Sequence, residues 1–226
     1  THSPLLTTLA FTMESLPVLF FGPFAGVLVD RWDRTKLLSL GFGASAVGTM
    51  VLGVIVTWGE VHAWHIIAFV TANGMGIALY EPIRSALIPS IVPSHMLVNA
   101  FALRSLAGNV TNIGVPTLVG IVMTWFGPGI TILLGVPLHL AGSVAALAIK
   151  AGKMVSTTSG SHSVFGDLAE GSRYVRTESP ILAVLFLTAL PMILGYPFVS
   201  ALMPVYASEV FAVGPTGLGL LMSALG

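Results

Sequence analysis

The sequence predicts an all-α fold, a polytopic helical bundle in a membrane, and three observations lead to that fold class. Only 8% of the 226 residues are charged, whereas roughly 25% are charged in an average soluble domain. Hydrophobic residues make up 55% of the chain, and its mean hydropathy is +0.94. The chain contains several nearly charge-free runs, each at least about 17–20 residues long. A helix of about 20 residues crosses a hydrocarbon layer about 30 Å thick. So few charges cannot cover the surface of a soluble protein of this length.

The predicted spans follow one another along most of the chain. The first run contains Glu14 as its one charged residue, and the others contain none. The runs are 5–29, 37–56, 64–80, 105–149, 181–206 and the incomplete 218–226. The fourth run is too long for one span, and we expect Phe-Gly-Pro-Gly at 126–129 to divide it, because Gly and Pro interrupt helices. The prediction is therefore six complete spans and one partial span.

Composition divides the chain into three predicted parts. Residues 1–150 are expected to form an N-terminal transmembrane bundle that lacks its first helix, and 181–226 to begin a C-terminal bundle. Between them, 151–180 contains Ser-Thr-Thr-Ser-Gly-Ser-His-Ser, a flexible linker composition, followed by apolar residues near helical spacing. We expect a short amphipathic helix there, on the cytoplasmic face. The chain starts without Met and stops inside an apolar run, so we expect a piece of a longer protein.

The positive charges predict the orientation in the membrane. All nine Lys and Arg residues lie within or beside alternate loops, 30–36, 81–104 and 150–180. Lys and Arg favour the cytoplasmic side of a membrane. These loops are therefore expected to be cytoplasmic, in a multi-pass protein of the plasma or inner membrane.

Composition also limits the functions to consider. The net charge is zero, so nothing favours nucleic acid as a partner. Without cysteine the chain has no disulfide, thiolate nucleophile or cysteine-ligated metal. Glu60, His62 and His65 have no fourth ligand in the sequence nearby and fit a hydrated loop better than a metal site. The sequence has no His, Asp and Glu cluster that favours an enzyme, and we expect no cofactor.

The loop between the first two spans carries the most specific pattern. It reads Gly26-Val-Leu-Val-Asp30-Arg31-Trp-Asp33-Arg34-Thr-Lys36. Asp30 and Arg31 are expected where a helix emerges, among further cations, and can form an ion-pair cluster at the membrane edge. A cluster that is made in one conformation and broken in another would be a conformational latch. The alternative is an ordinary positive-inside anchor with a tight turn.

This loop resembles the signature of the major facilitator superfamily: a Gly, three residues, an Asp, a basic residue, one residue, a Gly and then basic residues. Asp33 replaces the second Gly, a variation similar to the branch that contains macrolide- and siderophore-efflux proteins. Residues 81–93, followed by Asn99-Ala100, and residues 166–176 are similar to two further loops of that branch. The resemblance covers the whole chain and keeps register with the spans. It implies a twelve-helix fold, of which this chain would supply the second helix to the eighth.

The resemblance implies a secondary active transporter that works by alternating access. The branch suggests export of a small amphipathic compound, drug-like or siderophore-like, with protons as a candidate coupling ion. In the family, the signature loop stabilises the outward-facing state through contact with the other half of the protein. The alternatives are a non-transporting receptor or assembly subunit on the same fold and, less favoured, a membrane-embedded enzyme.

Glu14 and His139 are the ionisable residues expected inside the membrane. An acidic residue in the middle of a span costs roughly 2.5–3.5 kcal/mol on insertion scales, so Glu14 should face protein or water. It would exchange protons or contact a cationic substrate, or else be a protonated carboxyl bonded to a neighbour such as Thr12 or Ser15. His139 would belong to the same path, or be a packed, hydrogen-bonded histidine.

The fourth predicted span, which corresponds to the family's fifth helix, combines polar residues with a helix-bending motif. The polar candidates for a proton or substrate path are Arg104, Asn109 and Asn112. The two asparagines are one helical turn apart, and they could instead bond another helix. Gly114, Pro116 and Gly120 are similar to the Gly-Pro motif of family antiporters, with one residue inserted, which leaves antiport open. Pro116 removes a backbone donor, so we expect a kink.

Overall fold

The structure is a computed structural model that describes residues 4–149, 182–184, 186–187, 190 and 196–225. These residues are helical apart from short connections, and the described part of the chain contains no strand. This confirms the predicted all-α fold. The main elements are α1 (Pro4–Arg31), α2 (Arg34–Trp58), α3 (Ala63–Ile91), α4 (Leu97–Leu133), α5 (Gly135–Ala148), α8 (Tyr196–Val205) and α9 (Pro215–Ser223), with a short 3₁₀ turn at Ser94–Met96 and a π-helical turn at Tyr206–Val210.

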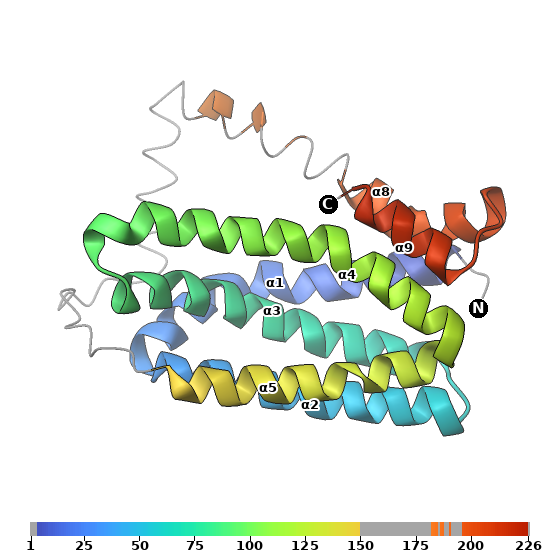
Figure 1. The fold of residues 1–226 in the computed structure, drawn as a ribbon, viewed down its shortest axis with the longest axis horizontal. Helices are drawn as coiled ribbons and strands as arrows, with labels where there is room; N and C mark the ends of the chain where they lie inside the picture. The colour runs from blue at the N-terminus through green and yellow to red at the C-terminus, as the bar shows by residue number, and fades with distance from the viewer. Residues whose placement is uncertain (1–3, 150–181, 185, 188–189, 191–195, 226) are drawn as a thin grey trace.

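Helix α4 contains the predicted division of the long charge-free run. Its backbone leaves helical geometry at Gly127, where φ is 78° and ψ is 171°. A left-handed φ of this kind suits glycine, which has no Cβ to clash with the backbone. Figure 1 shows the chain reversing there, so that the next helix runs back along α2. The prediction that 126–129 separates two antiparallel helices is confirmed.

The predicted loop at 81–104 is wrong in its bounds. Helix α3 continues to Ile91 with Pro82 and Pro89 inside it, and α4 already begins at Leu97. The connection is therefore only Val92–Met96, part of it a 3₁₀ turn. Ile83 and Leu87 are buried against α1, α2 and α5 in one core cluster. Burial of these side chains stabilises the extra turns of α3, where two prolines and two charged residues had suggested a loop.

The helices lie nearly alongside one another and their ends gather at two ends of the bundle (Figure 1). We call them the Asp33 end, where α1 meets α2 and α3 meets α4, and the Gly127 end, where α2 meets α3 and α4 reverses. Helix α1 packs mainly on α3, and α2 packs on α5, α4 and α3. Helix α9 packs on α4, and α8 makes a smaller contact with α1.

Large apolar side chains cover the outside of this bundle. Leu19, Val98 and Leu138 are 74%, 80% and 73% exposed, whereas Ile83 is fully buried. Among the described residues, four helical segments are long and apolar enough to cross a membrane, namely Leu5–Gly22, Arg34–Trp58, Ala63–Ile91 and Ser94–Leu133. An apolar surface of this extent is stable in contact with lipid, and its helices satisfy their backbone polar groups internally. The architecture is that of a polytopic membrane protein.

Small and polar side chains tie the helices together. The hydroxyls of Ser39 on α2 and Ser143 on α5 lie 2.8 Å apart, and those of Ser45 and Tyr80 lie 2.7 Å apart. A Cβ added at Gly41 would lie 2.7 Å from the Tyr80 ring, so the glycine makes room for this contact. Interhelical hydrogen bonds and small residues are the usual means by which helices associate in a membrane.

Candidate functional site

The signature loop is built around Asp33, which caps the N-terminus of α2. Its Oδ1 accepts hydrogen bonds from the Thr35 amide at 3.0 Å, the Thr35 hydroxyl at 2.7 Å and the Lys36 amide at 3.3 Å. The Thr35 hydroxyl bond, followed by the Lys36 amide bond, lowers the pKa of the Asp33 carboxyl below its usual value. Asp33 therefore has a structural role in place of the glycine of the superfamily pattern: it starts the second helix.

The rest of the loop joins two helices at the Asp33 end. Arg34 donates from Nη1 to the backbone oxygen of Ala86 at 3.2 Å, which links the start of α2 to α3. Lys36 is exposed. Gly26, Asp30 and Arg31 lie in the last turns of α1, and the side chains of Asp30 and Arg31 fall outside the described part of the structure. The choice between latch and anchor at Asp30 and Arg31 stays a prediction.

Glu14 lies where α1 crosses α3, and its partner is Asn73. The Asn73 amide donates from Nδ2 to Oε1 of Glu14 at 3.0 Å. The neighbours expected for Glu14 bond elsewhere, since the Thr12 and Ser15 hydroxyls donate to Thr8 and Phe11 backbone oxygens four residues earlier. The partner of Glu14 in the structure is thus an amide on another helix, and a role for Glu14 in a proton or substrate path stays a prediction. The sequence could predict that Glu14 needs a polar partner, but not that this partner is Asn73 on α3.

The close approach of α1 and α3 depends on Gly74, the residue after Asn73. A Cβ added at Gly74 would overlap the backbone oxygen of Glu14. Only a glycine allows the two backbones to approach so closely, and the same approach brings Asn73 within reach of the Glu14 carboxyl.

His139 makes a local contact. Its Nδ1 lies 2.8 Å from the backbone oxygen of Gly135, one turn earlier in α5, and the side chain is half-buried. This geometry is that of a packed, hydrogen-bonded histidine. A role for His139 in a proton path stays a prediction.

A polar groove between α3 and α4 brings together three of the predicted site residues. Arg104, Asn109 and Asn112 all line it, and its volume is about 540 Å³. The other lining residues are Glu81, Arg84, Phe101, Ser105 and Gly108. The structure therefore places Arg104 and the two asparagines on one side of a shared groove, opposite charged residues of α3.

Glu81 bridges two arginines across this groove. Arg84 donates to Oε1 of Glu81 at 3.3 Å, and Arg104 donates to Oε2 from α4. Arg104 also donates to the Ser85 hydroxyl at 3.3 Å. Sequence reasoning missed Glu81 and Arg84 because it ended the helix at Tyr80. Their spacing of three residues, which puts opposite charges on one helical face, was the signal that could have found them.

Nearer the Gly127 end, α4 packs closely against α9. A Cβ added at Gly120 would lie 2.5 Å from the backbone oxygen of Pro215, and one added at Gly219 would overlap the backbone oxygen of Pro116. Two glycines on facing helices thus let the two backbones touch. This α4–α9 contact was not predicted, because it joins residues about 100 positions apart with no charge or motif to pair them.

Hydroxyl groups reinforce the α4–α9 contact at two levels. The Thr124 and Thr216 hydroxyl oxygens lie 2.9 Å apart near the turn at Gly127, and Thr216 also donates to the Gly120 backbone oxygen at 3.3 Å. Deeper in the bundle, the Thr117 and Ser223 hydroxyl oxygens lie 2.7 Å apart. Each such bond contributes only about 0.5–1.5 kcal/mol net, so the contact is specific but separable.

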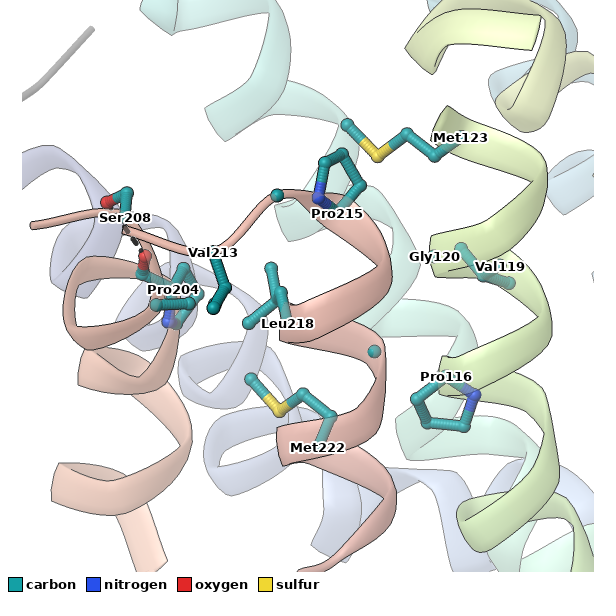
Figure 2. A pocket seen from close by; sticks show the side chains of 13 residues that line it. Pro116, Val119, Gly120, Met123, Pro204, Ser208, Val213, Pro215, Leu218 and Met222 are labelled. Atoms are coloured by element: carbon teal, nitrogen blue, oxygen red, sulfur yellow. Dashed lines mark hydrogen bonds between the residues drawn. The ribbon is translucent and has the colours of Figure 1, made fainter. Parts of the chain in front are cut away.

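Figure 2 shows an apolar cavity beside this contact, about 380 Å³ in volume, between α4, α9 and the end of α8. The side chains of Met123, Val213, Leu218 and Met222 border it. Ser208 is turned toward its own helix, where its hydroxyl donates to the Pro204 backbone oxygen at 3.0 Å. None of the described residues that line the cavity is charged.

The groove and the cavity share one face of α4. Their α4 residues recur at spacings of three and four, which is the repeat of one helical face. They are Phe101, Arg104, Ser105, Gly108, Asn109, Asn112, Pro116, Val119, Gly120 and Met123. This face is polar toward the Asp33 end and apolar toward the Gly127 end, where α9 covers it.

Pro116 lies inside α4 at the change from polar to apolar lining. Figure 1 shows α4 changing direction part-way along its length. A proline inside a helix removes one backbone hydrogen bond and bends the helix, as expected for the predicted kink. A Cβ added at Gly114 would meet nothing within 4 Å, so Gly114 makes no close contact, unlike Gly120.

The helical bundle and its apolar exterior are those of a polytopic membrane protein. Comparison with known proteins shows the family to which the chain belongs. A family model described as "Transmembrane secretion effector" matches residues 1–226. The chain therefore belongs to this family of the major facilitator superfamily, which comprises multi-pass membrane transporters.

Several curated proteins are similar to the chain. Macrolide efflux protein A of Streptococcus pyogenes is 23% identical over 221 residues, which cover 97% of this chain and 54% of that protein. Staphyloferrin A transporter of Staphylococcus aureus is 24% identical over 136 residues, 55% of this chain and 34% of that protein. An uncharacterised MFS-type transporter of Mycobacterium tuberculosis is 31% identical over 105 residues, 45% of this chain and 23% of that protein. The chain spans about half the length of Macrolide efflux protein A.

Proposed function

We propose that the protein containing this chain is a secondary active transporter that exports a small amphipathic compound by alternating access. The observation that carries this proposal is the shared face of α4. One part of it lines an open polar groove, and the other part is closed by α9. A path with one open and one closed end is what a single state of an alternating-access transporter requires.

The orientation of that path follows from the positive charges. The Asp33 end carries Arg34, Lys36, Arg84 and Arg104, which favours the cytoplasm on this side. The polar groove then opens inward and the α4–α9 contact closes the outer side. In this reading the structure corresponds to an inward-facing state, and export requires the α4–α9 contact to open.

The nature of the α4–α9 contact supports reversible opening. It consists of backbone contacts at Gly120 and Gly219 and of neutral hydroxyl bonds, without an ion pair. Interactions of this kind separate at modest cost, whereas breaking a buried ion pair costs about 3–5 kcal/mol. The predicted division of the chain into halves puts α4 and α9 on opposite sides of the moving interface.

Protons are the coupling ion in this proposal, and Glu14 is the group that carries them. Its carboxyl has a neutral amide partner, Asn73, and it forms no ion pair with a basic residue of the described part of the chain. An amide can accept a bond from the protonated carboxyl through its oxygen or donate to the ionised form through its nitrogen, so this pair tolerates both states of Glu14. An Arg or Lys partner would instead hold the carboxylate ionised.

Transport by the full-length protein tests the proposal. The protein is reconstituted into phosphatidylcholine liposomes, and a pH gradient is imposed across the membrane. Neutral, cationic and anionic amphipathic fluorescent dyes are then compared for uphill movement. We expect at least one dye to accumulate against its gradient, and the accumulation to stop when a protonophore removes the pH gradient. Saturable binding of dyes with no flux under any gradient would contradict the transporter and favour the receptor.

A further inference from the structure

We infer that the groove between α3 and α4 is an oxyanion site. In this site Arg84 and Arg104 receive the carboxylate or phosphate group of an amphipathic molecule, and Glu81 occupies the site until that molecule arrives. The inference rests on the proposed function insofar as the molecule is a transported compound.

In the ion pairs of this groove, the Glu81 carboxylate lies where the oxyanion of a ligand would bind. Each oxygen of the Glu81 carboxylate accepts from a different arginine, Oε1 from Arg84 at 3.3 Å and Oε2 from Arg104. The two guanidinium groups therefore converge on one carboxylate from two different helices. A guanidinium has five N–H donors, so a second oxyanion can bind to either arginine without new side chains.

The charges and their exposure favour exchange. Two positive charges face one negative charge, so the groove keeps a surplus of one positive charge. The Glu81 and Arg84 side chains are 55% and 54% exposed, and Arg104 is 31% exposed. Ion pairs with this exposure are weak, because water competes for both partners. An incoming oxyanion therefore displaces Glu81 at low cost.

The remaining lining residues fit an amphipathic molecule with an oxyanion group. Ser105, Asn109 and Asn112 add hydroxyl and amide donors along α4, and Phe101 adds an apolar wall. Beyond Asn112 the same face of α4 becomes apolar at Pro116. An amphiphile with its oxyanion at Arg104 can thus direct its apolar part along α4.

The position of the groove argues against ordinary surface charges. Glu81 lies ten residues before Ile91, the last residue of α3, which corresponds to about 15 Å along the helix axis. Charged side chains that are set back from the end of a helix in a membrane protein face protein or a water-filled cavity, which here is the groove that Glu81 shares with Arg104.

Matched fluorescent probes test the site in the full-length protein. The probes are pyrenebutanoate, which is anionic, and pyrenebutanamide, its neutral counterpart, titrated against protein in phosphatidylcholine nanodiscs. We expect the anion to bind at least about threefold more tightly than the amide, because the surplus positive charge of the groove attracts the anion alone, while water at these exposed arginines limits the gain. Arg104→Gln should abolish that preference, and Glu81→Gln should increase it several-fold by removing the internal competitor.

The Glu81→Gln result separates this site from a structural ion pair. If the pair only held α3 to α4, Glu81→Gln would weaken binding of both probes or leave it unchanged, and either result overturns the inference. Lys153→Gln is the control, since it removes one positive charge from the predicted cytoplasmic loop at 151–180 and should leave the preference unchanged. Equal affinity for the anion and the amide in the unmodified protein, with no effect of anionic lipid, would also overturn the inference.

Nanodiscs with phosphatidylglycerol distinguish a transported compound from a lipid. If a lipid phosphate fills the site, phosphatidylglycerol should compete with pyrenebutanoate, and retention of this lipid by the protein should depend on Arg104. That result supports the oxyanion site and assigns it to a headgroup. Export of pyrenebutanamide without preference for the anion would overturn the site and retain the transporter. Arg104-dependent binding of the anion without flux of any dye would retain the oxyanion site and overturn the transporter.

Discussion

The two ends of helix α4 differ in how they meet the rest of the protein, although they present the same helical face. Toward the Asp33 end, this face carries Arg104 and two asparagines and lines an open groove. Toward the Gly127 end, it carries Gly120 and is covered by α9 through direct backbone contact and two hydroxyl pairs. One face of α4 thus has an open end at the groove and a closed end beneath α9.

The difference shows which interactions are suited to opening and which are suited to holding ligand. Charged groups keep water or a ligand in the groove, because their desolvation is expensive. Small residues let the other end close without side-chain interlocking, so it can separate and re-form. If the two roles are divided along α4, changes near Gly120 should affect opening, and changes near Arg104 should affect ligand binding.

The largest effect on transport is expected from Gly120→Ala, with Gly114→Ala as its control. Both changes add one methyl group to α4, with the same gain in helix propensity. The new Cβ at Gly120 meets the Pro215 backbone at 2.5 Å, whereas the one at Gly114 meets nothing within 4 Å. Overpacking costs about 1–3 kcal/mol, which shifts an equilibrium by roughly 5- to 150-fold. We expect transport to fall by about tenfold or more in Gly120→Ala and to change little in Gly114→Ala. Similar transport rates in both variants would contradict a gate at α9.

Glu14→Gln separates coupling from binding. The Gln side chain keeps the acceptor that Asn73 uses but does not titrate. We expect the variant to bind dye with unchanged affinity and to lose uphill, pH-driven transport, while Glu14→Asp keeps a part of it. Should the site instead hold a cationic substrate, the variant would lose cationic dyes alone. Equal uphill transport by both proteins from pH 6 to 8 would leave Glu14 a packing role.

Gly74→Ala tests a close contact that lies within one bundle. The added Cβ would overlap the Glu14 backbone oxygen, whereas in Gly76→Ala, the control, the nearest atom is 3.6 Å away in the Tyr80 ring. We expect Gly74→Ala to lower the free energy of unfolding by about 1–3 kcal/mol, seen as a lower thermal midpoint in detergent. Gly76→Ala should keep the midpoint or raise it slightly. A normal midpoint for Gly74→Ala would mean that α1 and α3 do not approach so closely.

The smallest effect concerns the acid stability of the Asp33 cap. Hydrogen bonds lower the pKa of Asp33 in the folded protein, so ionised Asp33 stabilises the fold above the pKa of the unfolded chain, about 3.9. This contribution disappears as the pH falls through the lower folded-state pKa. Asp33→Asn keeps a capping oxygen without the titration. We expect the thermal midpoint of the unmodified protein to drop slightly more between pH 5 and pH 3 than that of the variant. Parallel profiles would contradict an ionised cap.

Much of the fold could be predicted from the sequence, because spans and breaks have local causes. The charge-free runs marked helices, and Gly127 marked a reversal that needs a left-handed φ. The end of α3 was mispredicted for an equally physical reason: Pro82 and Glu81 suggest a loop locally, but burial of Ile83 stabilises the helix.

The candidate site was predicted only in part. Arg104, Asn109 and Asn112 were recognised as polar residues in an apolar span, and the structure gathers them in one groove. Their relation to Glu81 and the pairing of Glu14 with Asn73 depend on how helices pack, which residue spacing does not encode. The α4–α9 contact left no sequence signal, because glycine–backbone contacts are specified by shape alone.

A reversible cross-link between α4 and α9 tests the central claim most directly. The Thr124 and Thr216 hydroxyl oxygens are 2.9 Å apart, and this chain has no cysteine, so Thr124→Cys combined with Thr216→Cys places two thiols in reach of each other. As a control, Ser39→Cys with Ser143→Cys joins α2 to α5, whose hydroxyls are 2.8 Å apart within one bundle. The account predicts that oxidation of the α4–α9 pair stops transport, that reduction restores it, and that the control cross-link leaves transport intact. Full transport with α4 and α9 covalently joined would contradict the account.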